Sequence, residues 1–115
     1  MNKRKFRRGE IYYVRPTSAN GSVQQGTRPA LIVGNDTGNR YCSVHPIVYI
    51  TSKTKAKLPT HVRIQLEHPS IIMCEHPHSV SDEQIKGYVK TLSEQEMKLV
   101  DRALRVALSL SPGRE

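Results

Sequence analysis

Short apolar runs separated by turn residues fill the first 80 residues of the chain, and this pattern constrains the fold most. Each run is rich in valine, isoleucine or tyrosine, as strands are. The predicted strands are Glu10–Val14, Pro29–Asn35, Ser43–Thr51, His61–Leu66 and Ser70–Cys74. Several short strands with dense turns predict a mainly β domain, either a small barrel or a sandwich.

The runs also indicate which strands are buried on one face and which on both. Residues His61–Leu66 alternate strictly, so the three apolar side chains should face the core while His61, Arg63 and Gln65 face the other side. The continuous apolar runs Pro29–Val33 and Ile71–Cys74 are typical of strands that are covered on both faces.

The last third of the chain has a helical pattern instead. Ser93–Glu96 has the Ser-x-x-Glu form of a capping box, and apolar residues follow at helical spacing. The stripe consists of Met97, Val100, Leu104, Ala107 and Leu108. We therefore expect a terminal helix ending near Ser109. A weaker box at Ser81–Gln84 predicts one helical turn before a short strand at Gly87–Lys90.

A chain of 115 residues is long enough for one ordinary domain. We expect a basic tail at residues 1–8 and a single domain at residues 9–111. No apolar run approaches the roughly 18 to 20 residues that cross a bilayer, and no export signal is visible, so we expect a cytoplasmic protein without a membrane partner. Cys42 and Cys74 should then be free thiols.

Positive charge is concentrated in the first part of the sequence. Residues 1–66 contain twelve Lys and Arg against two acids, whereas residues 67–115 contain six against eight. A clustered positive field attracts polyphosphates, so nucleic acid is the favoured partner. The basic tail alone would be an ordinary solvated segment. Two long polar loops, Arg15–Thr27 and Ser52–Thr60, are also present, and loops of this length in a small domain are usually functional or disordered. The second loop contains Lys53, Lys55 and Lys57, which support nucleic-acid binding more strongly than the tail does.

Two sets of residues are candidates for chemistry before any resemblance is considered. Arg28 begins one predicted strand and Thr51 ends another, but each alone is typical of a surface charge or a strand end. Cys74, His76 and His78 alternate like half of a zinc site, yet Pro77 should interrupt the strand and no second ligand pair has suitable spacing. The favoured interpretation is a buried Cys74 with exposed histidines and no metal.

Collinear motifs from Arg8 to Leu110 resemble those of the MazF/PemK toxins. Gly21–Pro29 is similar to the family's Gly-Ser-x-Gln-x-Gly-x-Arg-Pro segment, and Asn35–Asn39 to its Asn-Asp-x-Gly-Asn. Further matches are Arg8–Tyr13, Ile50–Ser52 and Lys55–Val62, the last resembling Lys-Leu-Pro-Thr-His-Val. The resemblance implies the CcdB/Kid/MazF-like toxin fold, a partly open SH3-like barrel with a C-terminal helix.

The resemblance also implies an activity, a metal-independent cleavage of single-stranded RNA or mRNA by a sequence-selective endoribonuclease. The ribose 2′-hydroxyl attacks the adjacent phosphate and leaves a 2′,3′-cyclic phosphate and a 5′-hydroxyl, so DNA cannot react. Arg28 matches the family's catalytic arginine and would bind the phosphate, and Thr51 matches its threonine and would bind the phosphate or orient the hydroxyl. No metal or other cofactor is implied.

Further residues carry over as RNA-binding groups of a groove between or beside the subunits of a homodimer. They are Ser22, Gln24, Lys57, Pro59, Thr60, Glu75, His76 and His78. Val23 departs from the family's usual glutamate, and His76 and His78 replace a glutamine and an arginine, so base preference should differ. Glu75 keeps the acidic position that PemK-type relatives use in catalysis.

The expected protein partner is an acidic antitoxin that restrains the activity. Two alternatives remain open at this point. One is a gyrase-inhibiting toxin like CcdB, and the other is a non-catalytic RNA-binding barrel. The Arg28–Pro29 and Lys57–His61 elements favour the nuclease.

Overall fold

The computed structural model describes residues 6–16, 26–53 and 57–110 of the chain. It is mainly β, with one six-stranded antiparallel sheet and a C-terminal helix, as the sequence predicts. The strands are β1 (Glu10–Val14), β2 (Arg28–Ile32), β3 (Val44–Thr51), β4 (His61–Gln65), β5 (Pro69–Ser81) and β6 (Ile85–Thr91). The helices are α1 (Asp36–Tyr41), the single 3-10 turn η1 (Asp82–Gln84) and α2 (Glu94–Leu108).

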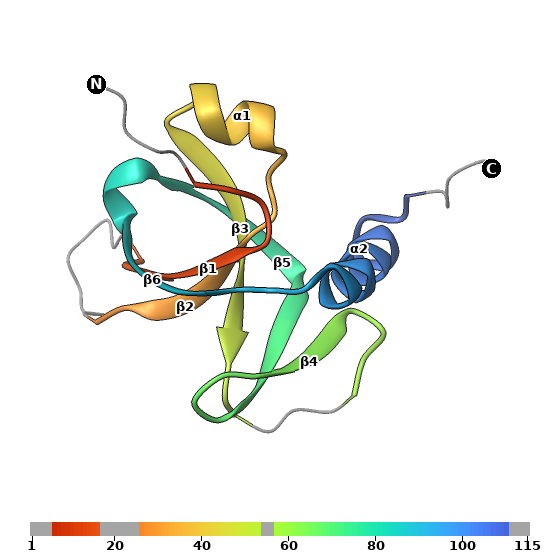
Figure 1. Cartoon of the computed structure of the whole chain (residues 1–115). Coiled ribbons are helices and arrows are strands. Elements are labelled where there is room, and N and C mark those ends of the chain that lie inside the picture. The colour runs from red at the N-terminus through yellow and green to blue at the C-terminus, as the bar shows by residue number, and fades with distance from the viewer. Residues whose placement is uncertain (1–5, 17–25, 54–56, 111–115) are drawn as a thin grey trace.

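The sheet has the order β4-β5-β3-β2-β1-β6, and it curls so that its ends approach each other (Figure 1). The first described strand pairs with the last, because Glu10 lies opposite Thr91. The Leu92 N–H then donates to the Gly9 carbonyl at 2.9 Å, which extends this pairing beyond both strands. Strands from the two ends of the chain therefore complete one sheet.

Apolar side chains cover both faces of the central strands. On one face, Ile11, Leu31, Val48 and Ile50 pack with residues of β4, β5 and α2, including Val100 and Ala103 of the helix. On the other face a second buried cluster consists of Tyr12, Val14, Ala30, Ile32, Ile47, Val80 and Ile85. The prediction that the β2 run is covered on both faces is confirmed.

The helix α2 begins where its capping box predicts. The Ser93 hydroxyl accepts from the Glu96 N–H at 3.1 Å, and the Glu96 carboxylate accepts from the Ser93 N–H at 2.8 Å. The helix ends at a left-handed Ser109, as expected from the sequence. The guanidinium of Arg8 donates to the Asp101 carboxylate at 2.8 Å, which fastens the N-terminal segment to the helix. Neither this helix nor any other in the described ranges has the length and hydrophobicity needed to cross a membrane.

Two predicted strands differ from the structure by more than two residues at their C-terminal ends. The strand predicted at Pro29–Asn35 ends at Ile32, because the Asn35 side chain accepts from the Gly38 N–H at 2.7 Å and starts the helix α1. The prediction that Pro77 interrupts a strand is wrong, since β5 continues to Ser81 with Pro77 opposite Val48. The partner β4 reaches only to Met73 on the other edge of β5, and a proline nitrogen is tolerated on such an unpaired edge.

A buried polar network joins α1 to the sheet. His45 is fully buried on β3, and its Nδ1 lies 3.2 Å from the Asn39 side-chain oxygen, while its Nε2 faces the Asp82 carboxylate. The Asn39 amide nitrogen donates to the Gly34 carbonyl at 2.9 Å, so the amide oxygen must be the atom that faces His45. Both ring nitrogens of His45 thus face side-chain oxygens, and the ring of Phe6 closes the site with its centroid 5.2 Å from that of His45.

Candidate functional site

Arg28 and Thr51, which the sequence could not bring together, lie at the adjoining ends of neighbouring strands. Arg28 is the first residue of β2 and Thr51 the last of β3. Ala30 lies opposite Tyr49, and continuing this antiparallel register by two residues places Arg28 opposite Thr51. Because alternate residues share a face, Arg28, Tyr49 and Thr51 belong to the same face of the sheet.

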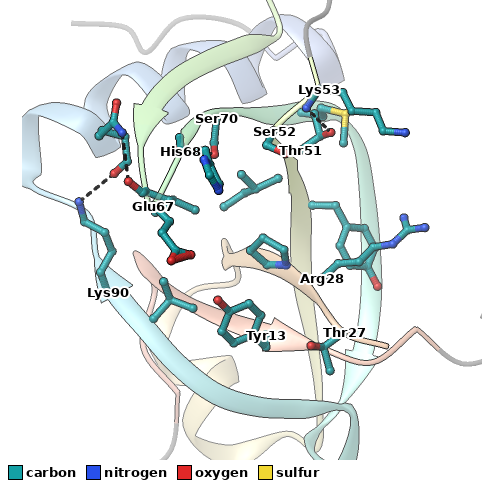
Figure 2. A pocket seen from close by; sticks show the side chains of 17 residues that line it. Tyr13, Thr27, Arg28, Thr51, Ser52, Lys53, Glu67, His68, Ser70 and Lys90 are labelled. Carbon is teal, nitrogen blue, oxygen red and sulfur yellow. Dashed lines mark hydrogen bonds between the residues drawn. The ribbon is translucent and has the colours of Figure 1, made fainter. Parts of the chain in front are cut away.

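Both residues line a pocket of about 880 Å³. Its apolar lining includes Pro29, Ile50, Leu66 and Val89. Figure 2 shows Tyr13, Glu67 and His68 pointing toward its middle, whereas the Arg28 side chain lies at its margin and points outward. The guanidinium is therefore presented to solvent beside the pocket instead of being buried in it.

The Arg28 guanidinium lies against an aromatic side chain. Its central carbon is 6.0 Å from the ring centroid of Tyr49, and the His78 ring meets the same tyrosine edge-on at 5.0 Å. Burial raises the pKa of Tyr49, and the positive charge of Arg28 opposes that shift only in part. The phenol is therefore neutral at physiological pH. Residues from β2, β3 and β5 thus form one row across the sheet, which we call the Arg28–Tyr49–His78 row.

The Thr51 hydroxyl is held in place by the backbone. Its oxygen accepts a hydrogen bond from the Lys53 N–H at 3.1 Å. Accepting this bond leaves the hydroxyl hydrogen to donate to another group. The half-buried Thr51 therefore offers a hydrogen-bond donor next to a permanently charged guanidinium, an arrangement that suits a phosphate group.

A second cluster is centred on the carboxylate of Glu75. Its two oxygens accept from the Thr60 hydroxyl and from His61 Nε2, both at 3.0 Å. Burial acts to raise the pKa of Glu75, but hydrogen bonds from His61, from its own backbone N–H and from Thr60 together hold this pKa below its usual range. The carboxylate is thus ionised at neutral pH and fixed in orientation.

The structure brings only some of the other predicted residues near these groups. Thr60 contacts Glu75, and His78 contacts the tyrosine beside Arg28. Lys57, Pro59 and His76 are exposed but do not line the pocket. Ser22 and Gln24 lie outside the described residues. The expectation of a buried Cys74 with exposed His76 and His78 is confirmed.

Tyr49 and His61 are the site residues that the sequence interpretation missed. Tyr49 stands two residues before Thr51 on the same strand, so strand alternation alone could have put both on one face. His61 was assigned only to the polar face of β4. No signal in the sequence joins His61 to Glu75, because antiparallel pairing of β4 with β5 brings them together.

No metal site is evident in the part of the chain that the structure describes. Within residues 6–16, 26–53 and 57–110, no three His, Cys, Asp or Glu side chains are grouped closely enough to hold an ion. Cys74 is fully buried and faces the apolar cluster beneath α2, away from the two exposed histidines.

Comparisons with known proteins agree with one another. A family model described as PemK-like, MazF-like toxin of type II toxin-antitoxin system matches residues 7–108. Among solved structures, MazE-MazF (Form-II) from Deinococcus radiodurans has a chain with a TM-score of 0.81 at 19% identity, covering 95% of this chain and 100% of that one. An endoribonuclease from Mycobacterial species has a TM-score of 0.79 at 20% identity, covering 96% and 97%. An endoribonuclease in complex with its cognate antitoxin, also from Mycobacterial species, has a TM-score of 0.78 at 22% identity, covering 93% and 98%.

Proposed function

The chain belongs to the PemK-like, MazF-like toxins of type II toxin-antitoxin systems, and on that premise we propose that it is a metal-independent endoribonuclease that cleaves single-stranded RNA at selected sequences. The observation that carries this proposal is the arrangement of Arg28 and Thr51. They lie at adjoining ends of β2 and β3, on one face of the sheet and beside one pocket.

The proposed reaction uses the RNA's own 2′-hydroxyl as nucleophile. Its oxygen bonds to the adjacent phosphorus while the bond from phosphorus to the 5′-oxygen breaks, which leaves a 2′,3′-cyclic phosphate. The nucleophile's proton is lost and the leaving oxygen gains one, so the second product ends in a 5′-hydroxyl. Negative charge accumulates on the non-bridging oxygens in between, and stabilising this charge is the main task of the protein.

Arg28 and Thr51 can perform this task without a metal. The guanidinium is always charged and presents several donors in one plane, which suits two phosphate oxygens at once. The Thr51 hydroxyl can donate to the same phosphate or to the attacking 2′-oxygen. The bases and phosphates on either side would be contacted by further predicted residues. They are the ionised Glu75, the half-buried Thr60 and the exposed Lys57, Pro59, His76 and His78, together with Ser22 and Gln24.

The test is cleavage of single-stranded RNA in excess EDTA, with product ends identified by mass spectrometry. We expect cyclic phosphate and 5′-hydroxyl ends, and no cleavage of the matching DNA strand. Activity that EDTA abolishes and zinc restores would contradict the mechanism. RNA that binds but stays intact would instead support a non-catalytic barrel.

Point variants test the roles proposed for Arg28, Thr51 and Lys57. Arg28→Ala and Thr51→Val should each lower kcat by about 10²-fold or more, since removing one transition-state donor typically costs that much. Arg40→Ala is the matched control for Arg28, because Arg40 is also an exposed arginine stacked on a tyrosine, at 5.9 Å, but on α1. Lys57→Ala should instead weaken RNA binding and reduce its salt dependence. Parental cleavage by Thr51→Val would show that the site is misassigned.

The proposed assembly is a homodimer that binds an acidic antitoxin. Apolar side chains remain exposed on the α2 side of the monomer, among them Leu99, Val106 and Leu110, and apolar surface of this kind suits association. The strongly basic first part of the sequence suits an acidic partner. Sedimentation at micromolar concentration should give a dimer. A monomer there, or a basic cognate antitoxin, would contradict this assembly.

A further inference from the structure

The aromatic member of the Arg28–Tyr49–His78 row is held more firmly than the arginine that it contacts. Tyr49 is half-buried and packs against the buried cluster that includes Ala30 and Ile47. Arg28 is exposed at the very start of its strand. Within the described ranges no carboxylate forms an ion pair with Arg28, so the tyrosine ring is its identified side-chain contact.

An aromatic partner affects an arginine differently from a carboxylate. A guanidinium that lies over an aromatic ring is attracted by the ring face, which has no carboxylate oxygen to occupy its N–H groups, so these remain free to donate elsewhere. A carboxylate would occupy two of those donors and neutralise the charge that a phosphate requires. The ring can therefore restrict where the guanidinium lies without competing with a substrate for its hydrogen bonds.

The contact of His78 with Tyr49 explains why the tyrosine ring stays in place. The His78 ring, on β5, meets Tyr49 at an interplanar angle of 63° with the centroids 5.0 Å apart. Edge-on contacts of this kind are favourable and fix ring orientation. His78 stands opposite Ile47, which places it on the same face of the sheet as Tyr49. Three adjacent strands thus determine the plane against which Arg28 lies.

We propose that Tyr49 is a positioning residue for Arg28, whose ring holds the guanidinium in the orientation needed to bind the scissile phosphate. This inference rests on the proposed nuclease function. The Tyr49 hydroxyl has no hydrogen-bond partner among the described residues, so the ring and not the hydroxyl should carry the effect. Because a held guanidinium loses less freedom in the transition state, the effect should appear in kcat.

The decisive comparison is between Tyr49→Phe and Tyr49→Leu. Phenylalanine keeps the ring, and we expect kcat within about twofold of the parent. Leucine keeps an apolar side chain for the core but offers no aromatic face, and we expect kcat to fall at least tenfold. Affinity for an uncleavable 2′-deoxy analogue should stay within about threefold. Tyr41→Leu is the matched control, since Tyr41 stacks with Arg40 on α1 and lies outside the pocket.

Nuclear magnetic resonance gives a readout that does not depend on cleavage. In the parent protein, ring currents from Tyr49 should shift the Arg28 Hε resonance upfield of its value in Tyr49→Leu, and Tyr49→Phe should retain the shift. In an Arg28→Ala background, Tyr49→Leu should cause no further loss of kcat. The spectrum of the parent alone tests the stacking even if Tyr49→Leu fails to fold.

Each contrary outcome has a distinct meaning. If the parent does not cleave RNA, the proposed function fails while the resonance shift still tests the contact. If the parent cleaves RNA and Tyr49→Leu cleaves equally well, positioning is refuted. An equal loss in Tyr49→Phe would assign the effect to the hydroxyl, and a change confined to KM would make Tyr49 a substrate contact. An Arg28 resonance without a ring-current shift would also overturn the inference.

Discussion

Replacing the fully buried His45 by leucine should destabilise the protein more than the same replacement of an exposed histidine. The two side chains are similar in volume, so the substitution mainly removes the two hydrogen bonds of the ring. Asn39 is 1% exposed, and its side-chain oxygen would lose its donor from His45. A buried acceptor without a partner costs about 1–3 kcal/mol.

The Asp82 side of the network contributes less. That carboxylate is 37% exposed, so water can replace the lost His45 donor, and the net cost there is about 0–1 kcal/mol. Together the two terms predict a loss of about 1–4 kcal/mol in the free energy of unfolding. For a domain of this size the melting temperature should fall by roughly 4–20 °C.

Urea denaturation of the parent and of three variants measures this effect. His76→Leu is the matched control, because the same chemical change at an exposed position should cost less than about 0.5 kcal/mol. Asp82→Asn keeps an oxygen that can accept from His45 and should cost about 1 kcal/mol. If His45→Leu unfolds within 1 kcal/mol of the parent and of His76→Leu, the network does not fasten α1 to the sheet.

Three further predictions concern Cys74, Glu75 and Gly34. The pKa of Cys74 is raised to about 12, mainly by burial and also by nearby acids, so a thiol reagent at pH 8 should titrate Cys42 in the folded protein and both cysteines only after unfolding. The lowered pKa of Glu75 means that its ionised form stabilises the fold above its ordinary value of 4.5, and this contribution is lost as pH falls through the lower folded value. The stability advantage of the parent over Glu75→Gln should therefore shrink below pH 4.5 in thermal melts, and an advantage constant with pH would contradict the assignment. Gly34→Ala should lower the melting temperature, because the new Cβ would lie 2.6 Å from a ring carbon of Pro46, and an unchanged melting curve would show that the loop can yield.

Local patterns in the sequence were enough to predict most of the strands and the terminal helix. Strict alternation located β4 and its inward face, and a capping box located the first turn of α2. The helix α1 escaped prediction because its six residues include Gly38 and Asn39, which favour turns over helices in isolation. Its stability comes from an N-cap and from the contact of Asn39 with the buried His45 on β3, a side-chain contact that no helical pattern in the sequence indicates.

The candidate site was predictable residue by residue but not as an arrangement. The family resemblance identified Arg28 and Thr51, and strand ends indicated that each stands beside a loop. Their proximity depends on the β2–β3 register, which no local pattern specifies. The pairing of Glu75 with Thr60 and His61 likewise depends on the β4–β5 register and on β5 continuing past Cys74.

The pairing of β1 with β6 determines when the molecule can first exist in its folded form. A ribosome makes β1 before the other strands of the sheet, but one of its two partners, β6 (Ile85–Thr91), is made only after all the other strands. The helix α2, whose Asp101 holds Arg8, is made later still. Contacts this distant in sequence form late and slowly. The residues around Arg28 and Thr51 are therefore translated well before the sheet that supports them can close, so a nascent chain lacks the supported candidate site until β6 and α2 have been made.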